Sequence, residues 1–183
     1  MNYSITMPMK LKKKDSLPKG LTKDEGMKEL PSKYLNRAYK NLELMNIISQ
    51  LSMNKEAQTA LKLLEDYSND EWIIITAYYS MYTSALALLA KIGYKSDTHT
   101  ATIFALEKFF VKKELIGQEY LAMFKHTKEQ INEQDVGNLS KEKENREIAQ
   151  YKVTEATTHA IAEASMKNAY AFMNKIKNII DSM

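Results

Sequence analysis

Residues that break helices are almost absent from this chain beyond residue 30. Of three prolines and five glycines in 183 residues, only Pro31 and three glycines lie in that part. A sequence with so few turn residues is poorly suited to the many short strands and tight turns of a β-sheet protein. Lysine, glutamate, alanine, leucine and methionine, which favour helices, are abundant instead. The sequence therefore predicts an all-α protein.

Apolar residues recur every three or four positions in several segments, which is the pattern of a helix with one buried face. The first segment begins at Pro31, and Ser32 is the expected N-cap. Its apolar stripe consists of Leu35, Ala38, Leu42, Met45 and Ile48. A shorter helical segment is expected after Asn54.

Capping patterns predict where the later helices begin. Ser68 and Glu71 have the spacing of a capping box and predict a helix that ends near Gly93. A second cap is expected at residues 96–98, and the last long helix is expected over about residues 154–180. The stripe predicted for that last helix is Ile161, Ala164, Asn168, Phe172, Ile176 and Ile179. Consecutive helices with short connections predict an antiparallel up-and-down bundle of four to six helices.

Residues 1–30 differ from the rest of the chain in pattern and in charge. They show no helical or strand period and contain the run Lys12-Lys13-Lys14, so we expect a flexible, lysine-rich leader before a helical domain at 31–183. Residues 1–33 carry eight lysines and four acidic groups, a net +4, and the rest carries 18 basic and 19 acidic groups, a net −1. The lysine run is either a phosphate-attracting arm or a solvated tail. The body is not strongly basic, as a domain that binds nucleic acid by charge alone would be.

The composition also argues against several classes of site. The absence of cysteine excludes disulfides, thiolate zinc sites and cysteine nucleophiles. His99, His126 and His159 lie far apart in sequence, so we predict no metal site, and no cofactor is expected. No apolar run approaches the roughly 20 residues that span a bilayer, and the start lacks the apolar core of a secretory signal. We therefore expect a cytoplasmic protein without a membrane partner.

The stretch AYYSMYTSALALL, residues 77–89, combines three tyrosines with small and aliphatic residues. Tyr78 and Tyr82 lie four positions apart on one helix face, and alanines such as Ala77 and Ala85 allow close helix approach. Packing in a core or an interface explains these tyrosines most simply, with each hydroxyl reaching a polar partner. Tyr78 and Tyr82 are also candidates for nucleotide or RNA contact.

Several short segments, in order, resemble the HEPN domain, a small all-helical domain. The first is AYYSMYTSALALLAKIGY at 77–94, and the second is DTHTATIFALEKFFVK at 97–112. The third is REIAQY at 146–151, which resembles the family's R-x-x-A-D-Y or R-x4–6-H element. The closing ASMKNAYAFMNKI at 164–176 resembles the family's last helix, so the resemblance covers roughly residues 34–180.

The resemblance implies a bundle of four or five helices and a homodimer. Many HEPN proteins are the toxin half of a toxin–antitoxin pair whose other half is a minimal nucleotidyltransferase, and some are metal-independent ribonucleases. Others are non-catalytic and bind RNA, nucleotide or a protein partner. This chain departs from the pattern in two places: it has an extra segment near 126–144, and Tyr151 stands where catalytic members carry histidine.

Metal-independent RNA cleavage needs a group that moves a proton near neutral pH and a cation that holds the phosphate. Arg146 is suited to the phosphate contact, whereas Tyr151, with an ordinary pKa near 10, is a poor base. Arg146 and Tyr151 are nevertheless the predicted catalytic positions. They also form the predicted nucleotide or RNA site, with Gln150 and Lys152 as weaker companions. Another histidine, His159 or His99, could supply the proton transfer instead. Folding or a dimer interface would have to bring it close to Arg146.

Three functions fit these observations. The first is a non-catalytic or weakly active HEPN protein that binds nucleotide, RNA or a minimal nucleotidyltransferase in a toxin–antitoxin-like system. The second is an active metal-independent HEPN ribonuclease toxin. The third is a dimerisation bundle with no small ligand, because the near-neutral body and the packing explanation for the tyrosines require none.

Overall fold

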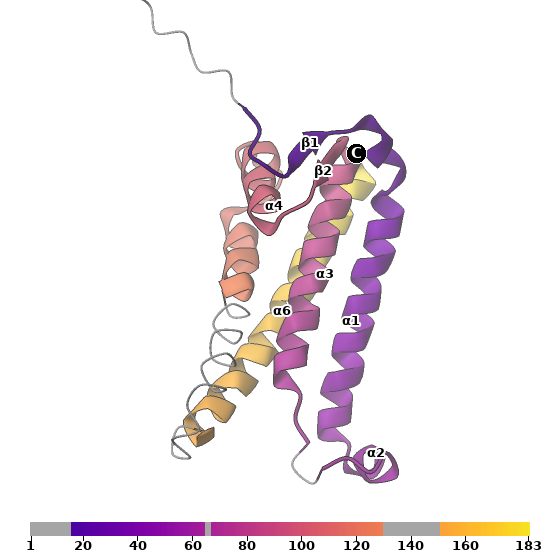
Figure 1. Ribbon diagram of the computed structural model, residues 1–183, viewed down its shortest axis with the longest axis vertical. Helices are drawn as coiled ribbons and strands as arrows, with labels where there is room; N and C mark the ends of the chain where they lie inside the picture. The colour runs from indigo at the N-terminus through magenta and orange to yellow at the C-terminus, as the bar shows by residue number, and fades with distance from the viewer. Residues whose placement is uncertain (1–15, 65–66, 130–150) are drawn as a thin grey trace, which may run out of the picture.

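The computed structural model is an elongated helical bundle (Figure 1). It describes residues 16–64, 67–129 and 151–183, and for residues 151–157 the backbone alone. Its long helices are α1 (Pro31–Met53), α3 (Asp70–Lys91) and α6 (Tyr151–Ser182). The described residues are mostly helical, with one two-stranded sheet, which confirms the all-α prediction.

The shorter elements lie at the ends and on one side of the bundle (Figure 1). Helix α2 (Lys55–Ala60) follows α1 at one end. At the other end, α4 (His99–Leu106) continues into η2 (Glu107–Val111), a turn of π-helix. A further helix begins at residue 118 and is described as far as residue 129. Helices α1 and α3 run in opposite directions, as an up-and-down bundle requires.

Helix α3 is the central helix of the bundle. It packs against α1, α6 and α4, and its Tyr78 and Tyr82 contact His99 of α4. It is long and apolar enough to cross a membrane, but 78% of its most apolar window is buried inside the protein. Ala77, Ser80, Ser84 and Ala85 are fully buried, and they allow the neighbouring helices to approach closely. The apolar character of α3 is therefore used in the core.

The helix starts differ in part from those predicted. Ser32 does not cap α1, because the helix already begins at Pro31, whose missing N–H costs nothing at a first helical position. The predicted capping box at the start of α3 is also wrong. The Oγ of Ser68 donates to Oδ2 of Asp70 at 3.2 Å, and the N-cap residue Asn69 makes no side-chain cap. The Oγ1 of Thr98 accepts from the Ala101 N–H at 3.1 Å, which confirms the cap predicted for α4.

Residues 16–30 are built into the fold, in contrast to the flexible leader that we expected there. Strand β1 (Leu21–Lys23) pairs antiparallel with β2 (Tyr94–Ser96), with Leu21 opposite Ser96. The 3-10 helix η1 (Glu25–Glu29) follows and buries Met27. Two apolar side chains, Leu21 and Met27, thus anchor a segment that has no helical or strand period. The part of the leader before residue 16 lies outside the described residues.

Helix α6 buries a stripe that differs from the prediction in its first half. Ala162, Ser165 and Ala169 are buried there, whereas Ala164 is exposed. The predicted and observed stripes meet at Phe172, which is fully buried, and continue together through Ile176. The small residues Ala162, Ser165 and Ala169 face the core in the first half, so the buried stripe there lies one position later along the chain than the predicted one.

Candidate functional site

The sequence-predicted phosphate site falls mainly outside the described residues. Arg146 and Gln150 lie there, as does nearly all of the extra segment near 126–144. Tyr151 and Lys152 are the first two residues of α6, and only their backbone is described. The structure therefore places two of these four residues at the start of a long helix and does not test their roles.

Tyr78 and Tyr82 belong to an aromatic cluster that joins α3, α4 and the helix of residues 118–129. The rings of Tyr78 and Tyr82 are stacked at 6.1 Å, and Tyr78 stacks on Phe124 at 5.4 Å. The phenol of Tyr78 also forms a 2.5 Å hydrogen bond with Nδ1 of His99. The His99 ring lies 4.3 Å from that of Tyr82.

The cluster keeps its ionisable groups neutral near pH 7. Burial raises the pKa of Tyr78 well above its ordinary value of about 10, and nearby tyrosines add to the effect. Burial, with a smaller contribution from Lys128, lowers the pKa of His99. We assign neutral His99 the Nε2–H tautomer, in which the phenol O–H of Tyr78 donates to Nδ1.

This geometry supports a packing role for Tyr78. The side chain is 3% exposed, and Tyr82 and Phe124 stack against its ring, so no ring face is open to a nucleobase. Tyr82 is half-buried, and Tyr79 is the exposed tyrosine of the stretch. His99 starts α4, as expected, and its Nδ1 is engaged in the hydrogen bond with Tyr78.

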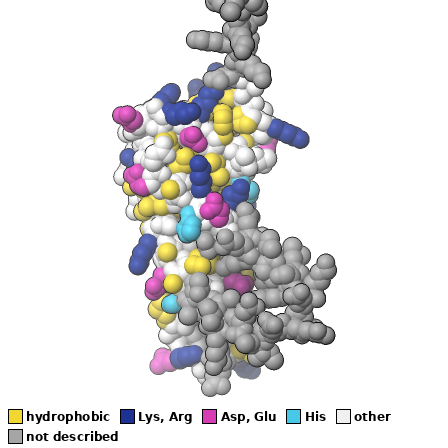
Figure 2. Space-filling view, turned by 90° about the vertical axis from the view of Figure 1, so that its left-hand side faces the viewer, with side chains coloured by type: hydrophobic (Ala, Val, Ile, Leu, Met, Phe, Trp, Pro, Cys, Tyr) yellow, Lys and Arg dark blue, Asp and Glu magenta, His cyan; other side chains and the backbone are white. Residues whose placement is uncertain are grey.

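Charged side chains are mixed in sign on the surface beside this cluster. Figure 2 shows lysine or arginine and aspartate or glutamate interspersed over the described part of that face. Such a surface has no large area of positive potential to attract a nucleic acid. Any RNA contact there depends on individual side chains.

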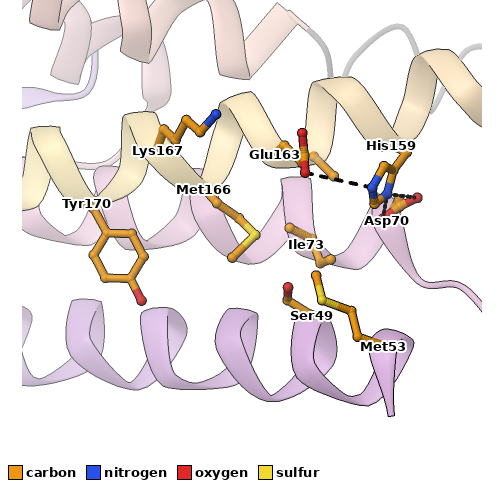
Figure 3. Close-up of a pocket in the computed structure, with 10 residues that line it drawn as sticks. Ser49, Met53, Asp70, Ile73, His159, Glu163, Met166, Lys167 and Tyr170 are labelled. Atoms are coloured by element: carbon orange, nitrogen blue, oxygen red, sulfur yellow. Dashed lines mark hydrogen bonds and ion pairs between the residues drawn. The ribbon is translucent and has the colours of Figure 1, made fainter. Parts of the chain in front are cut away.

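A groove of about 250 Å³ lies on another part of the molecule, between α1, α3 and α6 (Figure 3). Ile73 of α3 lies between the two flanking helices, Met53 comes from α1, and Met166 comes from α6. Methionine side chains adapt readily to the shape of a ligand. The groove is therefore apolar along its middle, and its polar groups gather toward its ends.

At one end of the groove, Asp70 and His159 form a close pair between α3 and α6 (Figure 3). The Nδ1 of His159 lies 3.2 Å from both carboxylate oxygens of Asp70. Its Nε2 lies 3.9 Å from Oε1 of Glu163, one turn further along α6. The Asp70 side chain is 11% exposed, whereas the imidazole is 58% exposed. A carboxylate thus holds an accessible imidazole by one nitrogen and leaves the other facing the groove.

At the other end, Tyr170 donates a 2.7 Å hydrogen bond to Oδ1 of Asn46 on α1. Lys167 lines the groove between Tyr170 and Glu163. The groove therefore combines an imidazole, two carboxylates, an ammonium group and an aromatic ring. Among the described residues, no group of three or more histidine, aspartate or glutamate side chains is arranged to hold a metal ion.

Sequence reasoning did not find the Asp70–His159 pair. The two residues are 89 positions apart, and each lies in a segment where another explanation sufficed. Asp70 lies within the expected capping box, and His159 lies in the expected last helix, 13 positions beyond Arg146. The pair exists because α6 crosses the start of α3.

Comparison with known proteins gives one distant relative. A protein of Archaeoglobus fulgidus named UPF0332 protein is 27% identical to this chain over 106 residues. The match covers 58% of this chain and 72% of the relative, whose name states no activity. No protein-family model matches the chain, and no solved structure matches it.

Proposed function

We propose that this chain is a HEPN-like component of a cytoplasmic toxin–antitoxin-like system. It binds RNA or nucleotide, or a minimal nucleotidyltransferase partner, and it acts as a homodimer with little or no catalysis at its motif positions. The order of the motif-like segments supports this proposal. The segment at 77–94 falls mainly on α3, the one at 97–112 falls on α4 and η2, and the closing one at 164–176 falls on α6, in a bundle of the kind that the resemblance implies. Of REIAQY, only Tyr151 lies within the described residues.

The hydrogen bond and ring packing of His99 are the observations that most favour binding over cleavage at Arg146 and Tyr151. His99 contacts two tyrosines of the stretch at 77–89: its Nδ1 is hydrogen-bonded to Tyr78 and its ring lies against Tyr82. A histidine whose Nδ1 is engaged in this way is a poor candidate to supply the proton transfer that a histidine at position 151 would supply. Arg146 and Tyr151 would then contact phosphate or base without transferring a proton.

Thermal unfolding of the full-length protein with a short single-stranded RNA, and separately with ATP, tests this function in EDTA. A ligand that binds only the folded state at 100 times its Kd adds about 2.7 kcal/mol. For a chain of this size that corresponds to an increase in Tm of about 5–10 °C. We expect Arg146→Ala to abolish the increase. Arg37→Ala, an exposed arginine of α1, is the matched control and should retain it.

If neither RNA nor ATP raises the Tm, or if both arginine variants lose the effect equally, the proposed binding of RNA or nucleotide at Arg146 is wrong. A bundle that only dimerises would give the first of these results. The measurement therefore separates a ligand-binding protein from a purely structural one.

A metal-independent ribonuclease is the second candidate function, and the Asp70–His159 pair favours it. An imidazole held at Nδ1 by a carboxylate is the arrangement with which many enzymes orient a general acid or base. His159 lies on α6, the helix that begins at Tyr151. The step of eight positions from Tyr151 to His159 corresponds to about 12 Å along the helix axis.

A further inference from the structure

We propose that His159 and Glu163 are the acid–base pair of a metal-independent RNA-cleaving site in the groove between α1, α3 and α6. The substrate is a phosphodiester of single-stranded RNA. This inference rests on the second function proposed above, and it places the chemistry on residues outside the motif-like positions.

The orientation of His159 is set by a short chain of hydrogen bonds. Ser68 donates to Asp70 at 3.2 Å, and Asp70 in turn accepts from Nδ1 of His159 at 3.2 Å. Asp70 lies in the first turn of α3, where the helix dipole favours a negative charge. Because the carboxylate is mostly buried and has these contacts, it acts as a positioning residue for the imidazole. The imidazole Nε2 is left to act on a substrate.

Glu163 supplies the second proton-transfer group. Its Oε1 lies 3.9 Å from Nε2 of His159, and both side chains are 58% exposed. The pair is therefore close enough to act on one phosphodiester and open enough to be reached by it. Glu163 lies four positions after His159, and Lys167 four positions after Glu163, so all three project from neighbouring turns of α6 (Figure 3).

The remaining groups of the groove suit a nucleotide. Lys167 brings a positive charge to the phosphate, which offsets the negative charge of Glu163. Tyr170 is 39% exposed, and its hydroxyl is fixed by Asn46, so its ring presents a surface for base stacking. The apolar middle of the groove, formed by Ile73 and Met166, suits the rest of a nucleobase.

The reaction is a transesterification within the RNA. Glu163 takes the proton of the ribose 2′-hydroxyl as the 2′-oxygen bonds to phosphorus. The bond from phosphorus to the 5′-oxygen of the next nucleotide breaks, and protonated His159 gives that oxygen a proton from Nε2. The products are a 2′,3′-cyclic phosphate and a free 5′-hydroxyl, so atoms and charge balance without a metal ion or another reactant.

The test is cleavage of a fluorescent single-stranded RNA by the full-length protein in EDTA, with an all-DNA strand of the same sequence as the resistant control. We expect wild type to form a cyclic phosphate end. His159→Gln and Glu163→Gln should each reduce kcat about 10²–10⁴-fold, the usual contribution of a general acid or base. Their matched controls, His126→Gln and Glu43→Gln, change exposed residues outside the groove and should retain wild-type rates.

Asp70→Asn tests the positioning role, because it should lower kcat while KM stays unchanged. Urea midpoints of every variant show whether each one folds. Cleavage that survives in His159→Gln but is lost in Arg146→Ala overturns this inference and keeps the ribonuclease function. RNA that wild type binds but leaves intact overturns both the inference and the ribonuclease function, and leaves the binding function standing.

Discussion

Tyr78→Phe removes a single oxygen atom from the middle of the protein and tests whether the aromatic cluster is held by its hydrogen bond. The substitution retains the ring that stacks on Tyr82 and Phe124. It removes the donor to Nδ1 of His99, so that nitrogen loses its protein partner. Any change in stability therefore reports the hydrogen bond, with packing held nearly constant.

The magnitude follows from burial. A typical intramolecular hydrogen bond contributes about 0.5–1.5 kcal/mol, and an unsatisfied buried acceptor costs about 1–3 kcal/mol. His99 is half-buried, so water can partly replace the phenol at Nδ1. We therefore expect a loss of about 1 kcal/mol in the free energy of unfolding. With an m-value of about 2 kcal/mol/M, the urea midpoint falls by about 0.5 M.

Urea unfolding followed by circular dichroism measures this loss at pH 7.5. Tyr79→Phe is the matched control, because Tyr79 is the next residue on α3 and is 45% exposed. We expect that control to change stability by no more than about 0.5 kcal/mol. Equal midpoints for the two variants would refute the role of the hydrogen bond. In a His99→Phe background, Tyr78→Phe should lose most of its effect, since the acceptor is already gone.

Two further predictions concern the same core. Burial lowers the folded-state pKa of His99, so the unfolded chain takes up a proton first as the pH falls below about 6.5. His99 therefore costs stability between about pH 7 and 5, and His99→Gln should show a smaller decrease in urea midpoint over that interval; a decrease equal to that of wild type would contradict this. Phe172→Ala removes a fully buried ring from α6 and should cost about 3–5 kcal/mol. Phe104→Ala, on the partly exposed face of α4, should cost markedly less, and equal urea midpoints would contradict the packing described for α6.

The helical fold could be predicted because its signals are local. Apolar spacing, the scarcity of glycine and proline, and the Thr98 cap all act within a few residues, and α1, α3, α4 and α6 form where those signals lie. Gly93 follows α3 with a φ of +74°, a conformation that glycine adopts easily and that suits the end of a helix. The predicted end of α3 near Gly93 is therefore confirmed.

The parts that the sequence did not predict depend on contacts between distant segments. Strand β1 has three residues and no visible period, and it forms because β2, more than 70 positions later, offers its edge. The first half of the α6 stripe was misplaced by one position, because alanine, serine and asparagine there give a weak apolar period. Local spacing carries no information about which helices cross, so neither feature could be read from it.

In the candidate site, too, some features follow from local sequence and others only from contacts between distant segments. Tyr78 and Tyr82 were predicted to favour packing, and their stacking follows from their spacing on one helix face. The Asp70–His159 pair joins the first turn of α3 to the middle of α6, and only the helix arrangement brings the two side chains together. The roles of Arg146 and Tyr151 stay predictions from the resemblance.

RNA binding is the one activity that both proposed functions can share, so an equilibrium binding measurement tests the account most directly. Fluorescence anisotropy of a labelled single-stranded RNA, titrated with the full-length protein in EDTA at 50 and 200 mM salt, gives the affinity and its salt dependence. We predict saturable binding that weakens at higher salt, is strongly reduced in Arg146→Ala and is unchanged in Arg37→Ala. No saturable binding at either salt concentration, or an equal loss in the two arginine variants, would contradict the account.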